Sequence, residues 1–63
     1  MKFKLTLEFP STAPVEATKT FNTKHKGRGW ALARRWENHC LTICGKNHKG
    51  EEFVVNTLEI LDN

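Results

Sequence analysis

Hydrophobic and polar residues alternate strictly over residues 2–9. The apolar members of this stretch are Phe3, Leu5, Leu7 and Phe9. A period of two is typical of a strand with one buried face. Two prolines in residues 10–14 cannot continue a sheet ladder, so they predict the loop of a hairpin. A second strand is expected over residues 15–22, at the margin of the sheet, because Lys19 interrupts its apolar side.

The apolar pattern then changes to a helical period. Side chains that would share one buried helix face recur at Gly29, Leu32, Ala33, Trp36 and Cys40. Thr23 is the predicted N-cap of this helix. A glycine inside a helix costs about 1 kcal/mol relative to alanine, and two glycines fall in the first turns. An alternative start near Arg28 would leave residues 24–27 as a basic loop.

After the helix, residues 41–44 have β-favouring side chains, which predict a third strand. Residues 45–50 predict the turn of a second hairpin, because asparagine and glycine tolerate positive φ. The last strand, over residues 51–61, is apolar on both faces, so it is expected either centrally under the helix or with a bulge. The predicted fold is α+β with the order ββαββ: one antiparallel sheet and one helix packed across one face, in a single domain of 63 residues.

The composition is that of an ordinary globular domain, with 38% hydrophobic and 27% charged residues. No stretch is long and apolar enough to span a membrane, and the charges of the first nine residues interrupt any secretory signal. Cys40 and Cys44 lie too close together to close a large loop. We therefore expect reduced thiols and a cytoplasmic protein.

Charge adds the strongest functional indication. The net charge is +3, but eight of the ten basic residues lie between residues 19 and 49, where Glu37 is the single acid. Such segregation predicts a dipolar molecule whose helix and hairpin tip meet phosphate or an acidic protein surface. The candidate binding residues are Lys24, Lys26, Arg28, Trp30, Arg34, Arg35, Lys46 and Lys49.

Trp30 has two interpretations. It flanks the predicted buried stripe among arginines, so an exposed ring would stack on a nucleic-acid base or anchor in a pocket of a partner protein. Alternatively, the ring folds over the end of the sheet, and the surrounding charges simply solvate the helix and the turn. Asn38 and Asn47 are candidates for reading base edges.

Other chemistry has little support in the sequence. Cys40, Cys44 and His48 form a C-x3-C-x3-H pattern, which is not a standard zinc spacing. Residues 27–29 lack the full glycine pattern of a nucleotide site. Neither a cysteine–histidine pair nor a carboxylate pair is arranged for catalysis. We expect no metal, no cofactor and no catalytic residue, and hence a protein that is not an enzyme.

Lys19-Thr20-Phe21, followed by Thr23 and an arginine-rich, glycine-containing helix with Trp36, resembles the strand-to-helix segment of small proteins of lambdoid phages and prophages. The resemblance covers about a third of the chain and implies a phage or mobile-element origin in a bacterial host cell. The arrangement is also similar in outline to the small bacteriophage T7 protein that inhibits host RNA polymerase. The helix of that protein is acidic and this one is basic, so its binding mode does not carry over.

Two functions of different classes follow. The first is a non-enzymatic accessory protein that binds DNA or RNA through the basic helix and hairpin tip, with steep salt dependence. The alternative is a modulator or inhibitor of a host protein, such as a polymerase, nuclease or defence complex, bound through Trp30 with Arg34 and Arg35 at the rim. Either terminal strand also offers an edge for a homodimer.

Overall fold

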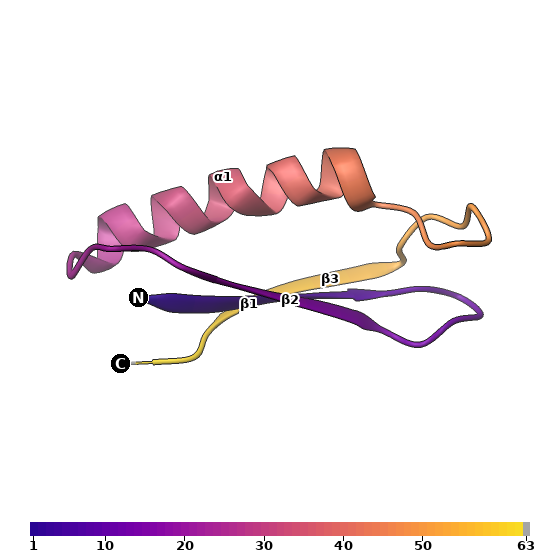
Figure 1. The fold of residues 1–63 in the computed structure, drawn as a ribbon, viewed down its shortest axis with the longest axis horizontal. Coiled ribbons are helices and arrows are strands. Elements are labelled where there is room, and N and C mark those ends of the chain that lie inside the picture. Colours follow the sequence, from indigo (N-terminus) through magenta and orange to yellow (C-terminus); the bar gives the residue numbers. More distant parts are fainter. Residues whose placement is uncertain (63) are drawn as a thin grey trace.

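The computed structural model describes residues 1–62 and shows one three-stranded antiparallel sheet covered on one face by a single helix (Figure 1). The elements are β1 (Lys2–Glu8), β2 (Val15–Thr20), α1 (Lys26–Cys44) and β3 (Val55–Ile60). The strand order is β2-β1-β3, so β2 and β3 both run antiparallel to the central β1. The α+β class and the helix-on-sheet arrangement are as predicted.

The core lies between β1 and α1. The predicted alternation is confirmed, since Phe3, Leu5, Leu7 and Phe9 are all buried, and Phe3 and Leu5 are the largest fully buried side chains. Partly buried side chains pack against Leu5, Leu7 and Phe9 of this row. They are Trp36, Cys40, Leu41, Phe53 and Leu58. Burial of apolar surface against β1 is therefore the main contact that holds α1 on the sheet.

Helix α1 begins later than Thr23. His25 occupies the N-cap position with an extended backbone and no side-chain cap, and Thr23 Oγ1 instead accepts a hydrogen bond from the His25 N–H at 3.2 Å. The first helical bond runs from Gly29 N to His25 O at 2.8 Å. The predicted cap at Thr23 is wrong by two residues, because its hydroxyl closes a local turn of the preceding loop.

The predicted third strand is also wrong. Residues 41–44 continue α1 to Cys44, so the described chain has three strands in the order ββαβ, where four were expected. Leu41 lies one turn beyond Glu37 on the sheet-facing side and packs on the core, and the Thr42 hydroxyl donates to the Asn38 carbonyl at 2.9 Å. Helical propensity disfavours Thr and Ile by less than about 1 kcal/mol, so the burial of Leu41 outweighs it.

Residues 45–54 form a loop with a tight turn and a single β-bridge, between Lys46 and Glu52. The turn was predicted, and Gly50 has the expected positive φ, at 77°. Regular pairing begins only at Val55, so the last strand is shorter than residues 51–61. It is also an edge strand, so the first of the two expected alternatives, a central position, is wrong.

The free edges of the sheet are β2 and β3. All six residues of β2 are exposed, as expected of a marginal strand, whereas Leu58 and Ile60 of β3 are half-buried under α1. The N-terminal strand pairs on both sides, so the expectation that either terminal strand offers an edge is wrong for β1.

Candidate functional site

The outer face of α1 carries one line of exposed polar side chains, here called the basic stripe, whose charged members are Arg28 and Arg35. Residues seven apart on an α-helix lie almost on one line, and Arg28, Arg35 and Thr42 are related in this way. His39 lies beside this line, and all four side chains are exposed. The flanks of the stripe carry the uncharged residues Ala31, Leu32, Asn38 and Ile43.

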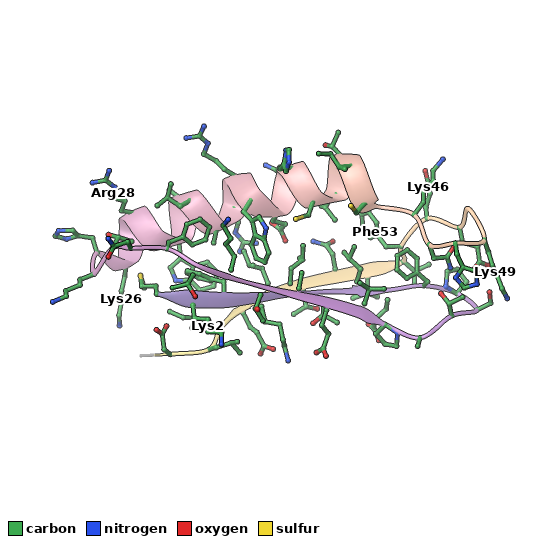
Figure 2. All side chains as sticks on the ribbon, in the orientation of Figure 1. Lys2, Lys26, Arg28, Lys46, Lys49 and Phe53 are labelled. Atoms are coloured by element: carbon green, nitrogen blue, oxygen red, sulfur yellow. The ribbon has the colours of Figure 1, made fainter. Side chains whose placement is uncertain are left out.

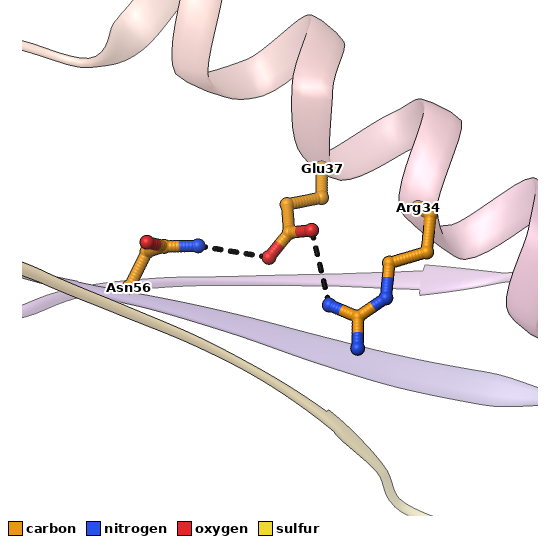
Figure 3. A network of polar contacts seen from close by, with 3 residues as sticks. All are labelled: Arg34, Glu37 and Asn56. Carbon is orange, nitrogen blue, oxygen red and sulfur yellow. Dashed lines mark hydrogen bonds and ion pairs between the residues drawn. The ribbon is translucent and has the colours of Figure 1, made fainter.

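The single acid of α1 is turned away from this stripe. Glu37 faces the sheet and retains only 7% of its accessible surface. Its Oε2 accepts a hydrogen bond from Asn56 Nδ2 of β3 at 2.8 Å, and its Oε1 pairs with Arg34 Nη1 at 3.2 Å (Figure 3). The exposed surface of α1 is therefore free of carboxylates.

Arg34 belongs to this inner network. Its guanidinium carbon also lies 5.4 Å from the centroid of the Trp30 ring, a cation–π arrangement. The side chain is 59% exposed, but its head group is held by Glu37 and Trp30. Arg34 is therefore a stabilising residue of the helix–sheet contact, although the sequence placed it among the binding residues.

The expectation of an exposed Trp30 is wrong. The ring is half-buried and meets Phe3 edge-on, with centroids 5.0 Å apart, while Arg34 lies over its face. The alternative interpretation, in which Trp30 folds over the sheet, is the one the structure has. None of the six Phe and Trp side chains is exposed, so no phenyl or indole ring is displayed for stacking.

Acidic residues gather on the opposite face of the molecule. Lys4 faces away from α1, and its Nζ lies 3.1 Å from Glu16 and 3.0 Å from Glu59. These contacts raise the pKa of the Lys4 ammonium, with the hydrogen bond to Glu59 as the larger cause. Glu8 is exposed on the same face. The sheet face thus carries three glutamates beside Lys2 and Lys4, whereas the helix face carries two arginines and no exposed carboxylate.

The remaining candidate cations lie at the two ends of the long axis of a molecule that measures 38 × 19 × 14 Å. Lys26 and Arg28 lie at one end, and Lys46 and Lys49 lie at the other (Figure 2). Arg28 and Lys46 point to the helix side, while Lys26 and Lys49 point toward the sheet side. Lys24 is exposed in the loop before α1.

Asn47 is fully engaged within the structure. Its Nδ2 donates to Thr12 at 2.7 Å and to Glu51 at 2.9 Å, and its Oδ1 accepts from the N–H groups of Lys49 and Glu51. These bonds join the turn at residues 47–50 to the hairpin loop at residues 10–14. Asn47 is consequently a structural residue, unsuited to the base reading considered from the sequence.

An open cleft of about 600 Å³ lies at the end of α1. Its apolar lining comes from Leu41, Ile43 and Phe53, with Lys46 and Glu52 beside them. Ile43 is 64% exposed, which is unusual for so large an apolar side chain. The sequence analysis missed this cleft because it assigned residues 41–44 to a strand.

The two cysteines lie one turn apart on α1, both as free thiols. Burial raises the pKa of the half-buried Cys40 thiol, which lowers its thiolate fraction at neutral pH. Among residues 1–62, no three His, Cys, Asp or Glu side chains are grouped to hold a metal ion. In the same part of the chain, no helix combines the length and apolar character needed to cross a membrane.

The hydrogen bond between Asn56 and Glu37 was not predicted from the sequence. A signal was present, because Glu37 lies four residues after Ala33 and eight after Gly29, on the line of the most buried helix positions. Asn56 likewise interrupts the apolar side of the last strand. The two polar interruptions face each other across the helix–sheet contact.

No family model, no curated protein and no solved structure matches this chain. The geometry of the basic helix face is therefore the basis on which a function is argued.

Proposed function

We propose that the protein is a small accessory protein that binds nucleic acid through the outer face of α1. The observation that carries the proposal is the separation of charge between the two faces. Arg28 and Arg35 project from a helix whose single acid, Glu37, is buried, while Glu8, Glu16 and Glu59 occupy the far side of the sheet. A surface of one sign attracts a polyanion and orients it during encounter.

The binding residues within the proposal are the exposed cations of the helix side, which are Arg28, Arg35 and Lys46. Lys24 in the preceding loop, and Lys26 and Lys49 at the two ends of the molecule, add positive charge beside this face. Lysine and arginine neutralise phosphates and release counterions, so affinity falls steeply with salt. A role in a phage or mobile element agrees with the resemblance of residues 19–36 and remains part of the proposal.

Fluorescence anisotropy of labelled DNA and RNA across a salt series tests this function. The test variant is Arg28→Gln/Arg35→Gln, and its matched control is Lys2→Gln/Lys4→Gln, which removes the same charge from the opposite face. Arg34 is left unchanged because it pairs with the buried Glu37. We expect the test variant to bind more weakly and to flatten the salt slope by about 2, with each lost phosphate contact contributing about 1.

The control should bind as tightly as the wild type or slightly less tightly. Equal losses in the two variants would show that net charge alone governs binding, which contradicts the assignment to α1. No binding of the wild type at low salt would refute the function itself.

The cleft at the end of α1 favours a second candidate, the modulation of a host protein with an acidic surface. An apolar side chain of a partner would enter beside Ile43 and Phe53, with Lys46 as the cation at the rim. In this second candidate function, the partner protein is anchored in the cleft and not by Trp30. Ile43→Asp would abolish capture of such a protein while leaving nucleic-acid affinity within about threefold, since the stripe keeps its cations.

A further inference from the structure

The exposed cations on the helix side follow the length of the molecule. Arg28 lies in the first turn of α1, Arg35 lies midway, and Lys46 lies two residues beyond the last turn. At 1.5 Å per residue, the helix spans about 24 Å from Arg28 to Cys44, and Lys46 lies two residues farther along the chain, in the loop. Figure 2 shows Arg28 and Lys46 projecting on the same side at opposite ends of the long axis.

The length of the molecule is comparable with the repeat of a B-form duplex. Equivalent phosphates on one side of DNA recur every helical turn, about 34–36 Å. The molecule is 38 Å long, so its two ends reach phosphates one turn apart when its long axis follows the duplex axis. Arg35 then meets the backbone between them.

The uncharged flanks of the stripe argue against a helix seated deep in the major groove. A helix in the groove lies between two phosphate rows and uses cations on both sides of its axis. Here Ala31 and Asn38 lie on one flank, and Leu32 and Ile43 lie on the other. A single line of cations is suited instead to contact with a single row of phosphates.

The aromatic residues argue against a single strand. Proteins that bind single strands combine a basic groove with exposed aromatic rings on which bases stack. All six Phe and Trp side chains are buried or half-buried, and Arg34 lies over the ring of Trp30.

We infer that the nucleic acid bound by the basic face is duplex DNA, lying along the long axis of α1 and contacted at phosphates about one turn apart. This inference rests on the proposed function and deepens it. Contacts to phosphates alone carry no direct sequence information, so the mode of binding is independent of base sequence.

The test measures salt slopes, which count phosphates and do not depend on how many overlapping sites a longer duplex offers. The probes are DNA hairpins that share one loop and have stems of about 6 and about 16 base pairs, one shorter and one longer than a helical turn. An unpaired strand of about 16 nucleotides and an RNA hairpin with the longer stem complete the set.

The slope should be steeper on the longer DNA stem by about 1 or more, because only this stem meets both ends of the protein. Lys46→Gln should flatten the slope on the longer stem by about 1 and leave the shorter stem almost unaffected, since that stem can use Arg28 and Arg35 alone. Lys2→Gln, on the acidic face, is the matched control and should change neither slope.

Equal slopes on both stems would overturn the spanning arrangement, and equal or tighter binding of the unpaired strand or the RNA stem would overturn the choice of duplex DNA. In each of these cases the protein still binds nucleic acid, so the proposed function stands. Failure to bind any probe at low salt refutes the function as well, which separates the two results.

Discussion

Glu37 shows how a single polar residue orders the helix–sheet contact. Its carboxylate is almost completely removed from solvent, and it meets Arg34 of its own helix and Asn56 of β3. A buried hydrogen bond of this kind adds little net stability, but it specifies one pairing, because any other placement leaves the carboxylate without partners. Residues 37 and 56 therefore set the position of α1 over β3.

Replacement of Glu37 tests this role. Glu37→Ala should lower the free energy of unfolding by about 1–3 kcal/mol, since it removes the acceptor of two hydrogen bonds and leaves a gap in the contact. Urea denaturation monitored by tryptophan fluorescence measures the change. Glu8→Ala is the control, because its side chain is exposed on the acidic face, and its effect should stay within about 0.5 kcal/mol. A similar loss in both variants would contradict the structural role of Glu37.

Among the elements, the loop of residues 45–54 is ordered by a short antiparallel bridge and by side-chain hydrogen bonds. Glu51 accepts hydrogen bonds from Asn47 Nδ2 at 2.9 Å and from the Ser11 hydroxyl at 2.7 Å. The bond from Asn47 is the larger cause that lowers the pKa of the Glu51 carboxyl, and the bond from Ser11 is the second. The loop is thus tied to the hairpin loop through one carboxylate.

The sign of the pH dependence follows from this lowered pKa. The unfolded chain takes up a proton at Glu51 more readily than the folded chain, so its stabilising contribution is complete above the ordinary carboxyl pKa of about 4.5. That contribution is lost as pH falls through the lower folded pKa. NMR titration of the Glu51 carboxyl should find its midpoint below that of an unfolded peptide.

Thermal unfolding at different pH values measures the contribution of Glu51 to stability. The stability difference between the wild type and Glu51→Gln should be largest near neutral pH and should shrink below about pH 4.5. Glu52→Gln serves as the control, because the Glu52 side chain makes no hydrogen bond in the described part of the chain. A difference that grows with acidity would contradict the contribution of Glu51.

At the scale of the whole molecule, the thin shape makes the distribution of charge decisive. The domain is only one helix and one sheet thick, so almost every charged side chain belongs to the helix face, the sheet face or one of the two ends. The sheet face carries Lys2 and Lys4 against Glu8, Glu16 and Glu59, so carboxylates outnumber cations there. A polyanion is therefore attracted more strongly to the helix face than to the sheet face.

Binding to one face predicts a stabilising effect on the whole domain. A ligand that binds the folded state alone, at about 100 times its dissociation constant, adds about 2.7 kcal/mol. In a domain of this size, that gain raises the melting temperature by about 10 °C or more. Duplex DNA at low salt should produce this shift in the wild type, and a smaller one in Arg28→Gln/Arg35→Gln. A shift that is the same in both proteins would place the DNA elsewhere.

The sequence by itself determined the features that depend on local periodicity and composition. The alternation of Phe3, Leu5, Leu7 and Phe9 predicted β1, the prolines of residues 10–14 predicted the hairpin loop, and the basic segment of residues 19–49 predicted a charged surface on the helix. These features follow from side-chain spacing along one strand or helix, so no knowledge of the neighbouring elements is needed.

Only the tertiary structure decided the features that depend on a partner element. Residues 41–44 are helical because Leu41 packs on the core there. Trp30 is half-buried because its ring meets Phe3 edge-on and lies under the Arg34 guanidinium. Glu37 is buried because β3 brings Asn56 to it. Burial and hydrogen-bond partners arise between segments distant in the chain, and they outweigh local propensities of less than about 1 kcal/mol per residue.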